Sequence, residues 1–196
     1  RDDSLDPVLI KSIYSHRLEI TKRIAENTKN IDIRGKKKYT ALMIAANHGD
    51  YPLVEYLLNK NANVNLKNIY GDNALILSAR WGHFDVVKLL LQNQASISDK
   101  NNYGYTALHS AAYKGHFEII KLLLQQGANV NEIDINGNTP LILAASQGNL
   151  EVVKILIESE ANVSIKDKYG YSALKEASVK NNLEIIKLLK NAGAVE

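Results

Sequence analysis

The sequence predicts an all-α fold, a solenoid built from helix-turn-helix units, on three observations. One pattern recurs at a spacing of 33 residues and begins each time at a small polar residue: Thr40, Asn73, Thr106, Thr139 and Ser172. A glycine, replaced once by asparagine, follows nine residues after each of them. Paired apolar residues one helical turn apart come next. Self-similarity at a fixed period is typical of arrays in which each unit contacts its neighbours.

The first helix of each unit is predicted to begin at the small polar residue and to end at the glycine. A Thr, Ser or Asn side chain accepts a hydrogen bond from an otherwise unpaired amide of the first turn. Glycine ends a helix in the left-handed conformation without steric cost, because it has no Cβ. We therefore expect helix ends at Gly49, Gly82, Gly115, Gly148 and, with the next most tolerant residue, Asn181.

The second helix of each unit carries apolar pairs that form one face, such as Ile119 and Ile120 followed by Leu123 and Leu124. Helices this short are marginal when isolated, so stacking of neighbouring units must stabilise them.

Three segments of the chain, "GYTALHSAAYKGHFEIIKLLLQQGANVN", "GNTPLILAASQGNLEVVKILIESEANV" and "GDNALILSARWGHFDVVKLLLQNQASI", resemble the ankyrin repeat. That repeat is a β-turn finger followed by two antiparallel helices, and the resemblance extends over nearly the whole chain. It implies an ankyrin-repeat solenoid that binds a partner protein through the concave surface formed by the finger tips and the inner helices. It does not identify the partner.

We expect one domain over residues 1–196, without an internal linker. Its full inner repeats are 35–67, 68–100, 101–133 and 134–166. The terminal segments keep the register but place polar residues where inner repeats are small or apolar: Lys11, Thr21, Arg23 and Lys29 at one end, Glu176 and Lys190 at the other. This predicts an N-terminal cap repeat at 1–34 and a C-terminal cap repeat at 167–196.

Two features depart from the repeat pattern. Gln94 and Glu160 stand where Gly127 and Gly193 end the second helix, and a left-handed side chain costs about 1 to 2 kcal/mol. In the finger of residues 35–40, Lys38 replaces the glycine of the other fingers, which predicts a different turn.

The resemblance assigns partner contact to five positions in each repeat: the two before the finger glycine, the one after it, and the two before the helix-ending glycine. These positions are rich in aromatic and basic residues. They hold eight of the ten tyrosines, counting Tyr14 in the N-terminal cap, and the only tryptophan. In the second to sixth repeats they hold six basic residues and one acid, whereas the whole chain has a net charge of +3. Rigid aromatic side chains and cations are typical of binding surfaces. We predict a partner-binding site at Lys36, Lys37, Tyr39, Tyr70, Asp72, Arg80, Trp81, Tyr103, Tyr105, Tyr113, Lys114, Tyr169 and Tyr171.

The expected function is therefore a non-enzymatic protein-interaction module for an acidic segment or patch of a partner. The fifth repeat has no aromatic or charged residue at the contact positions, so Tyr169 and Tyr171 would form a second, smaller patch. The alternative interpretation is that the tyrosines were copied with one ancestral repeat unit and are merely exposed to solvent. Nucleic acid is an alternative partner, since tyrosine can stack on bases and lysine neutralises phosphates, but the low net charge disfavours it. The chain is also compatible with a targeting part of a longer protein.

No pattern in the chain indicates catalysis, a cofactor or a metal site. It contains neither a phosphate-binding glycine loop nor a metal-ligand cluster, and the absence of cysteine excludes thiolate sites and disulfides. His83 and His116 occupy the same place in successive repeats, and His109 stands at another position of the repeat. The resemblance to the ankyrin repeat implies that both positions are usually structural. We expect neither catalytic nor metal-binding residues.

We expect a monomer, and a chain that does not enter a membrane. No apolar run approaches the roughly 20 residues that a membrane-spanning helix needs. The expected compartment is the cytoplasm, with a secreted or periplasmic mature form as the alternative.

Overall fold

A computed structural model describes residues 8–14, 18–28 and 30–195 of the chain. The chain divides into two compact units, Arg1–Ser96 and Ile97–Glu196. Apart from an isolated bridge between Lys166 and Ser172, the regular elements of the described residues are all helical, so the predicted all-α fold is confirmed. The single domain over residues 1–196 and its cap repeats stay predictions.

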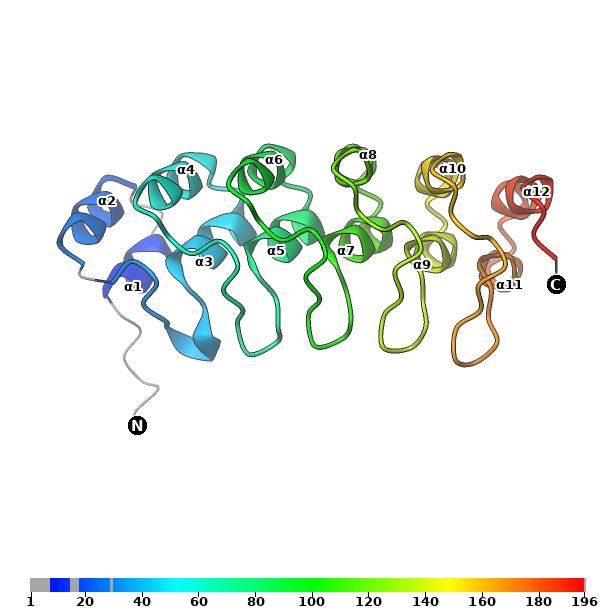
Figure 1. The fold of residues 1–196 in the computed structure, drawn as a ribbon, viewed down its shortest axis with the longest axis horizontal. Coiled ribbons are helices and arrows are strands. Elements are labelled where there is room, and N and C mark those ends of the chain that lie inside the picture. The colour runs from blue at the N-terminus through cyan, green and yellow to red at the C-terminus, as the bar shows by residue number, and fades with distance from the viewer. Residues whose placement is uncertain (1–7, 15–17, 29, 196) are drawn as a thin grey trace. The chain divides into compact units, whose positions relative to one another are not determined.

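The first unit contains three helix pairs and a short 3-10 turn (Figure 1). The elements in chain order are α1 (Val8–Tyr14), α2 (Leu18–Asn27), η1 (Lys36–Lys38), α3 (Ala41–His48), α4 (Tyr51–Asn59), α5 (Ala74–Trp81) and α6 (Phe84–Gln92).

The second unit contains three further helix pairs. They are α7 (Ala107–Lys114) with α8 (Phe117–Gln125), α9 (Pro140–Gln147) with α10 (Leu150–Glu158), and α11 (Ala173–Val179) with α12 (Leu183–Asn191). In the described parts of both units, no helix has the length and apolar character needed to cross a bilayer.

The helix ends follow the sequence signals. The side chains of Thr40, Asn73, Thr106, Thr139 and Ser172 each accept a hydrogen bond from the amide three residues ahead, as predicted for N-caps. Left-handed glycines end α3, α5, α7 and α9, and Asn181, with φ 55°, lies just beyond α11. Local capping therefore sets the length of each inner helix.

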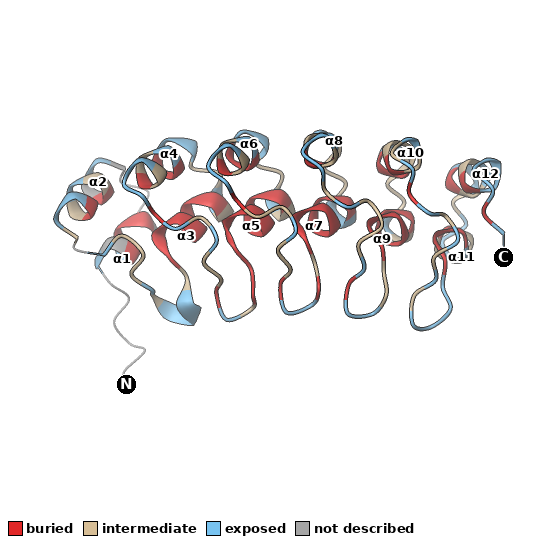
Figure 2. Cartoon of the chain, viewed as in Figure 1, coloured by how far each residue is buried: buried red, intermediate tan, exposed pale blue. Residues whose placement is uncertain are grey.

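The core of each unit runs along its inner helices, the first helix of every pair (Figure 2). α3 packs on α5 in the first unit, and α9 packs on both α7 and α11 in the second. Alanines such as Ala45 and Ala111 are completely buried, and their small side chains let neighbouring helices approach closely. The outer helices bury only one face, which carries residues such as Val54 and Leu123.

The terminal repeats expose most of the polar residues that the sequence analysis singled out. Lys11, Arg23 and Lys190 are exposed and Glu176 is half-buried. Thr21 differs, because it is buried and its hydroxyl has no hydrogen-bond partner among the residues that the structure describes. Lys29 lies outside the described residues.

An Asn or Asp at the start of four fingers holds each of these loops in shape. The Oδ1 atom of Asn101 accepts hydrogen bonds from the amides of Tyr103 and Tyr105, both at 3.0 Å. Asn68, Asp134 and Asp167 bind the corresponding amides of their own fingers. These residues recur every 33 residues, but their role in the fingers was not predicted from the sequence.

The first finger has no such side chain, because Gly35 occupies this position. Lys37 and Lys38 both adopt left-handed backbone conformations there, with φ 56° and 59°, and form the turn η1. The predicted difference of this finger is confirmed. Its cause is the combined replacement of the acceptor side chain and of the turn glycine.

His109 connects two repeats of the second unit from a fully buried position. Its Nδ1 accepts a hydrogen bond from the Thr106 amide at 3.3 Å, so its Nε2 carries the proton and donates to the Asn138 carbonyl oxygen at 3.2 Å. Burial lowers the pKa of His109 from 6.5 to about 4. The imidazole is therefore neutral in the folded protein, as its structural role requires.

Acidification between pH 6.5 and 4 should destabilise the second unit through His109. The unfolded chain takes up a proton on this residue near pH 6.5 while the folded chain resists it, so up to about 3 kcal/mol of stability is lost as the pH falls through this window. The free energy of unfolding, measured in urea at pH 7, 6 and 5, should fall in this way with decreasing pH. The His109→Gln variant should show a weaker dependence on pH. An NMR titration in which the His109 ring protonates near pH 6.5 in the folded protein would contradict the assignment.

Gln94 and Glu160 adopt the predicted left-handed conformation, with φ 65° and 64°. Gln94→Gly and Glu160→Gly should each raise stability by up to about 1 kcal/mol, less the entropy that glycine adds to the unfolded chain. Gly127→Ala is the reverse control, because φ is +85° and a Cβ there would meet no atom within 4 Å. Denaturant midpoints measure the three effects. Lower midpoints for both glycine variants would show that this strain does not limit stability.

Candidate functional site

The predicted site residues of the first unit lie on its finger loops and on the last turn of α5. Lys36 and Lys37 belong to η1, Tyr70 lies in the next finger, and all three are at least partly exposed. Trp81 ends α5 with 54% of its surface exposed. The core does not enclose these side chains, so they are available for contact.

Asp72 and Arg80 form an ion pair within the first unit. The two guanidinium nitrogens of Arg80 donate to the two carboxylate oxygens of Asp72 at 2.9 and 2.7 Å. Asp72 is buried, whereas Arg80 is half-buried. The pair orients Arg80 and compensates its charge locally, so Asp72 acts on this surface through Arg80 and not by its own exposure.

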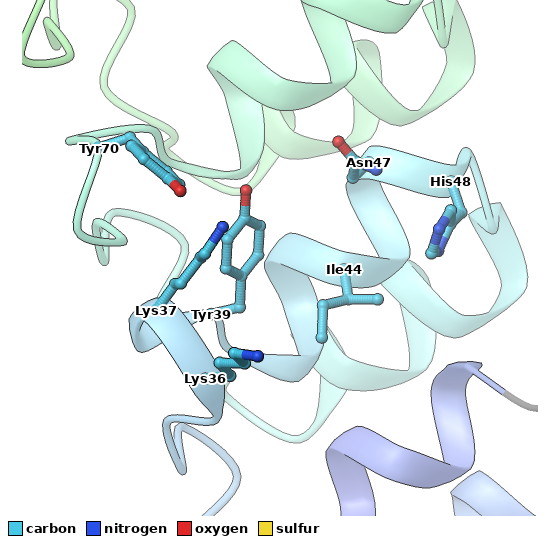
Figure 3. Close-up of a pocket in the computed structure, with 7 residues that line it drawn as sticks. All are labelled: Lys36, Lys37, Tyr39, Ile44, Asn47, His48 and Tyr70. Atoms are coloured by element: carbon cyan, nitrogen blue, oxygen red, sulfur yellow. The ribbon is translucent and has the colours of Figure 1, made fainter. Parts of the chain in front are cut away.

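A hollow of about 380 Å³, partly open to solvent, lies between the first two fingers and the end of α3 (Figure 3). We call it the lysine-tyrosine hollow, and its lining residues are Lys36, Lys37, Tyr39, Ile44, Asn47, His48 and Tyr70. It brings together four predicted site residues. Ile44, Asn47 and His48 were not among the predicted site residues, although Asn47 and His48 precede the helix-ending Gly49 on the expected concave surface. Their place in one hollow depends on how two fingers face α3.

The Lys37 ammonium group contacts the aromatic wall of the lysine-tyrosine hollow. Its Nζ lies 5.3 Å from the centroid of the Tyr70 ring, within the range of a cation–π interaction. The neighbouring Tyr70 side chain raises the pKa of Lys37 above its ordinary value. Lys37 therefore stays positively charged at neutral pH.

In the second unit, Tyr103 and Tyr105 flank the glycine of one finger but differ in exposure. Tyr103 exposes 58% of its surface, whereas Tyr105 is half-buried. The Tyr105 ring stacks on buried His109, with centroids 5.6 Å apart and planes inclined by 23°. Tyr105 thus supports the repeat core as well as the surface.

Two further pairs complete the predicted site in the second unit. Tyr113 and Lys114 end α7, both exposed, and the Lys114 Nζ lies 5.5 Å from the centroid of the Tyr113 ring. Tyr169 and Tyr171 flank the glycine of the last finger, where Tyr169 exposes 75% of its surface. Together with Lys166 and Lys175 they line a hollow of about 280 Å³. The side chain of Tyr14, which ends α1, lies outside the described part of the chain.

Adjacent fingers are joined by backbone hydrogen bonds. The Ile69 amide donates to the Lys37 carbonyl at 3.1 Å in the first unit. In the second, the Ile135 amide donates to the Tyr103 carbonyl at 3.1 Å, and the Lys168 amide to the Asn136 carbonyl at 2.8 Å. These bonds lie at the finger tips, so the side chains there are carried on a connected backbone.

The arrangement offers aromatic faces, ammonium groups and amides, which are suited to molecular contact. In the residues that the structure describes, His, Asp and Glu form no group of three that could hold a metal ion. Within each unit, the helix pairs stack through small residues of their inner helices, and backbone hydrogen bonds connect adjacent fingers. This arrangement defines a helical-repeat scaffold.

Comparison with protein families identifies this scaffold. The model described as ankyrin repeats (3 copies) matches residues 3–68, 42–134 and 130–195. The chain therefore belongs to the ankyrin-repeat family, as its resemblance to the repeat indicated. Ankyrin repeats are generally non-enzymatic scaffolds for interactions between proteins. None of the curated proteins matches the chain significantly.

Two finger glycines with the same backbone conformation should differ in their tolerance of a side chain. A Cβ on Gly104 would lie 2.6 Å from the Ile135 nitrogen, whereas a Cβ on Gly170 would meet nothing within 4 Å. Gly170→Ala should cost only the left-handed strain of about 1 kcal/mol, and Gly104→Ala more than about 2 kcal/mol, because the adjacent finger must move. Denaturant unfolding compares the two variants. Equal losses would show that the finger contact is easily displaced.

Proposed function

We propose that the finger loops and the last turns of the inner helices bind a partner protein through an acidic segment of that partner. The observation that carries the proposal is the exposure of large aromatic side chains at these places, above all Trp81, Tyr103, Tyr113 and Tyr169. Aromatic residues contribute large contact areas and often dominate binding energy. All four side chains are exposed, so their replacement should leave the fold largely intact.

Positive charge supports an acidic partner. Lys37 in the first unit and Lys114 in the second are exposed beside tyrosine rings, and Lys36 is an exposed residue of the lysine-tyrosine hollow. Basic groups around an aromatic contact speed association with an acidic surface and select against basic ones. The Arg80 guanidinium, oriented by Asp72, adds a planar donor group beside Trp81 in the sequence.

The proposed mechanism is preorganisation. The finger loops are held by the Asn and Asp side chains at their start and by the bonds between adjacent fingers. A surface that is ordered before association loses less conformational entropy when the partner binds. In this proposal the chain is a monomeric binding module that performs no catalysis itself.

The combined variant Trp81→Ala, Tyr103→Ala and Tyr113→Ala should weaken binding of an acidic partner peptide by at least about 30-fold, or about 2 kcal/mol. The melting temperature should change little, because all three side chains are exposed. Tyr51→Ala is the matched control, since Tyr51 is an exposed aromatic residue on the outer helix α4. Peptides selected from an Asp- and Glu-rich library can be titrated calorimetrically against the three proteins.

Equal loss in the Tyr51 control, or no loss in the combined variant, would assign partner contact to another surface. Titration with random single-stranded oligonucleotides over a range of salt concentrations provides the comparison with nucleic acid. A steep linear fall of log affinity with log salt, together with tighter binding than any acidic peptide, would favour nucleic acid as the partner.

A further inference from the structure

The first finger differs from the other four in a way that places basic side chains around a hollow. It lacks both the acceptor side chain and the turn glycine of the other fingers. Its two left-handed residues are lysines, although left-handed geometry is unfavourable for such side chains. Unfavourable backbone geometry of this kind is concentrated at functional sites. The strained turn therefore indicates a functional site at the lysine-tyrosine hollow, which it borders.

The lining of the lysine-tyrosine hollow is basic, aromatic and amide-bearing, with no acidic residue among its seven members. Figure 3 shows the Lys37 side chain extending beside Tyr39 toward the Tyr70 hydroxyl, with Asn47 and His48 across the opening. The Lys37 ammonium group lies 5.3 Å from the centroid of the Tyr70 ring, and its three N–H groups can donate to a ligand in the hollow.

We infer that the lysine-tyrosine hollow binds a phosphate monoester, carried on a phosphorylated side chain of the partner. This inference rests on the proposed function, because it specifies the chemistry of the acidic partner. It assigns Lys37 as the principal cation, with Lys36 as a second one. The Asn47 amide and the Tyr39 hydroxyl add neutral donors to the same oxygens.

The number of donors favours a phosphate group over a carboxylate. A carboxylate presents two oxygens and one negative charge, whereas a phosphate monoester presents three terminal oxygens and a charge near −2 at pH 7. Two ammonium groups, an amide and the tyrosine hydroxyls together match the larger acceptor. The hollow is also a single local site, bounded by two fingers and α3, and therefore suits one phosphate group better than a continuous nucleic-acid backbone.

The test compares three acidic peptides of one sequence that carry phosphoserine, serine or glutamate at the same position. The phosphoserine peptide should bind the protein at least about tenfold more tightly than either of the others. Lys37→Gln should reduce this preference for the phosphoserine peptide by a factor of at least about five. Lys38→Gln is the matched control, because Lys38 belongs to the same turn and is also left-handed, but does not line the hollow.

A second variant, Asn47→Asp, places a carboxylate in the hollow and should also abolish the preference, by repulsion of the phosphate. Amide chemical shifts of residues 36–39, 47, 48 and 70 should follow the titration. Inorganic phosphate provides a separate arm. Saturable binding of inorganic phosphate that depends on Lys37, without a preference for the phosphopeptide, would assign the hollow to a free small phosphate and overturn the assignment to a partner side chain.

The remaining outcomes separate this inference from the proposed function. Equal binding of the three peptides, weakened by the aromatic variants, would overturn the phosphate site and retain the acidic protein partner. Equal effects of Lys37→Gln and Lys38→Gln would indicate diffuse charge attraction and also overturn the site. A phosphopeptide preference that depends on Lys37 but is unaffected by the aromatic variants would retain the hollow and contradict the wider contact surface.

Discussion

Packing between short inner helices is the constraint on which the rest of each unit depends. α3, α5, α7 and α9 have eight residues each, too few for a stable isolated helix. They persist because buried alanines bring neighbouring helices close and because outer-helix residues such as Leu123 cover them. The repeats must therefore keep the same small and apolar residues at the same register.

This constraint leaves the fingers outside the core and lets their side chains vary. The finger backbone is held by Asn68, Asn101, Asp134 and Asp167 and by bonds to adjacent fingers, so it does not rely on the side chains at the tips. Aromatic and basic residues can accumulate there with little effect on folding. Tyr105 is a partial exception, because its ring stacks on buried His109.

Charge on these surfaces depends on neighbours as well as on composition. By composition, Arg80 contributes a full positive charge to this surface. In the structure, however, its guanidinium group donates two hydrogen bonds to the Asp72 carboxylate. Lys37 lies beside the Tyr70 ring, and this neighbour raises the pKa of Lys37. The lysine-tyrosine hollow consequently combines two lysines with a concave shape and has no acidic residue in its lining.

The sequence alone determined the fold class, the helix ends, the left-handed positions at Gln94 and Glu160, and the altered first finger. These features depend on residues close in the chain or repeated every 33 residues, and capping and backbone sterics act over such short distances. Only the tertiary structure decided that Asp72 is buried against Arg80 and that Lys37, Asn47 and Tyr70 share one hollow. Such contacts depend on side-chain direction and on how one finger faces the next, and residue spacing does not specify either.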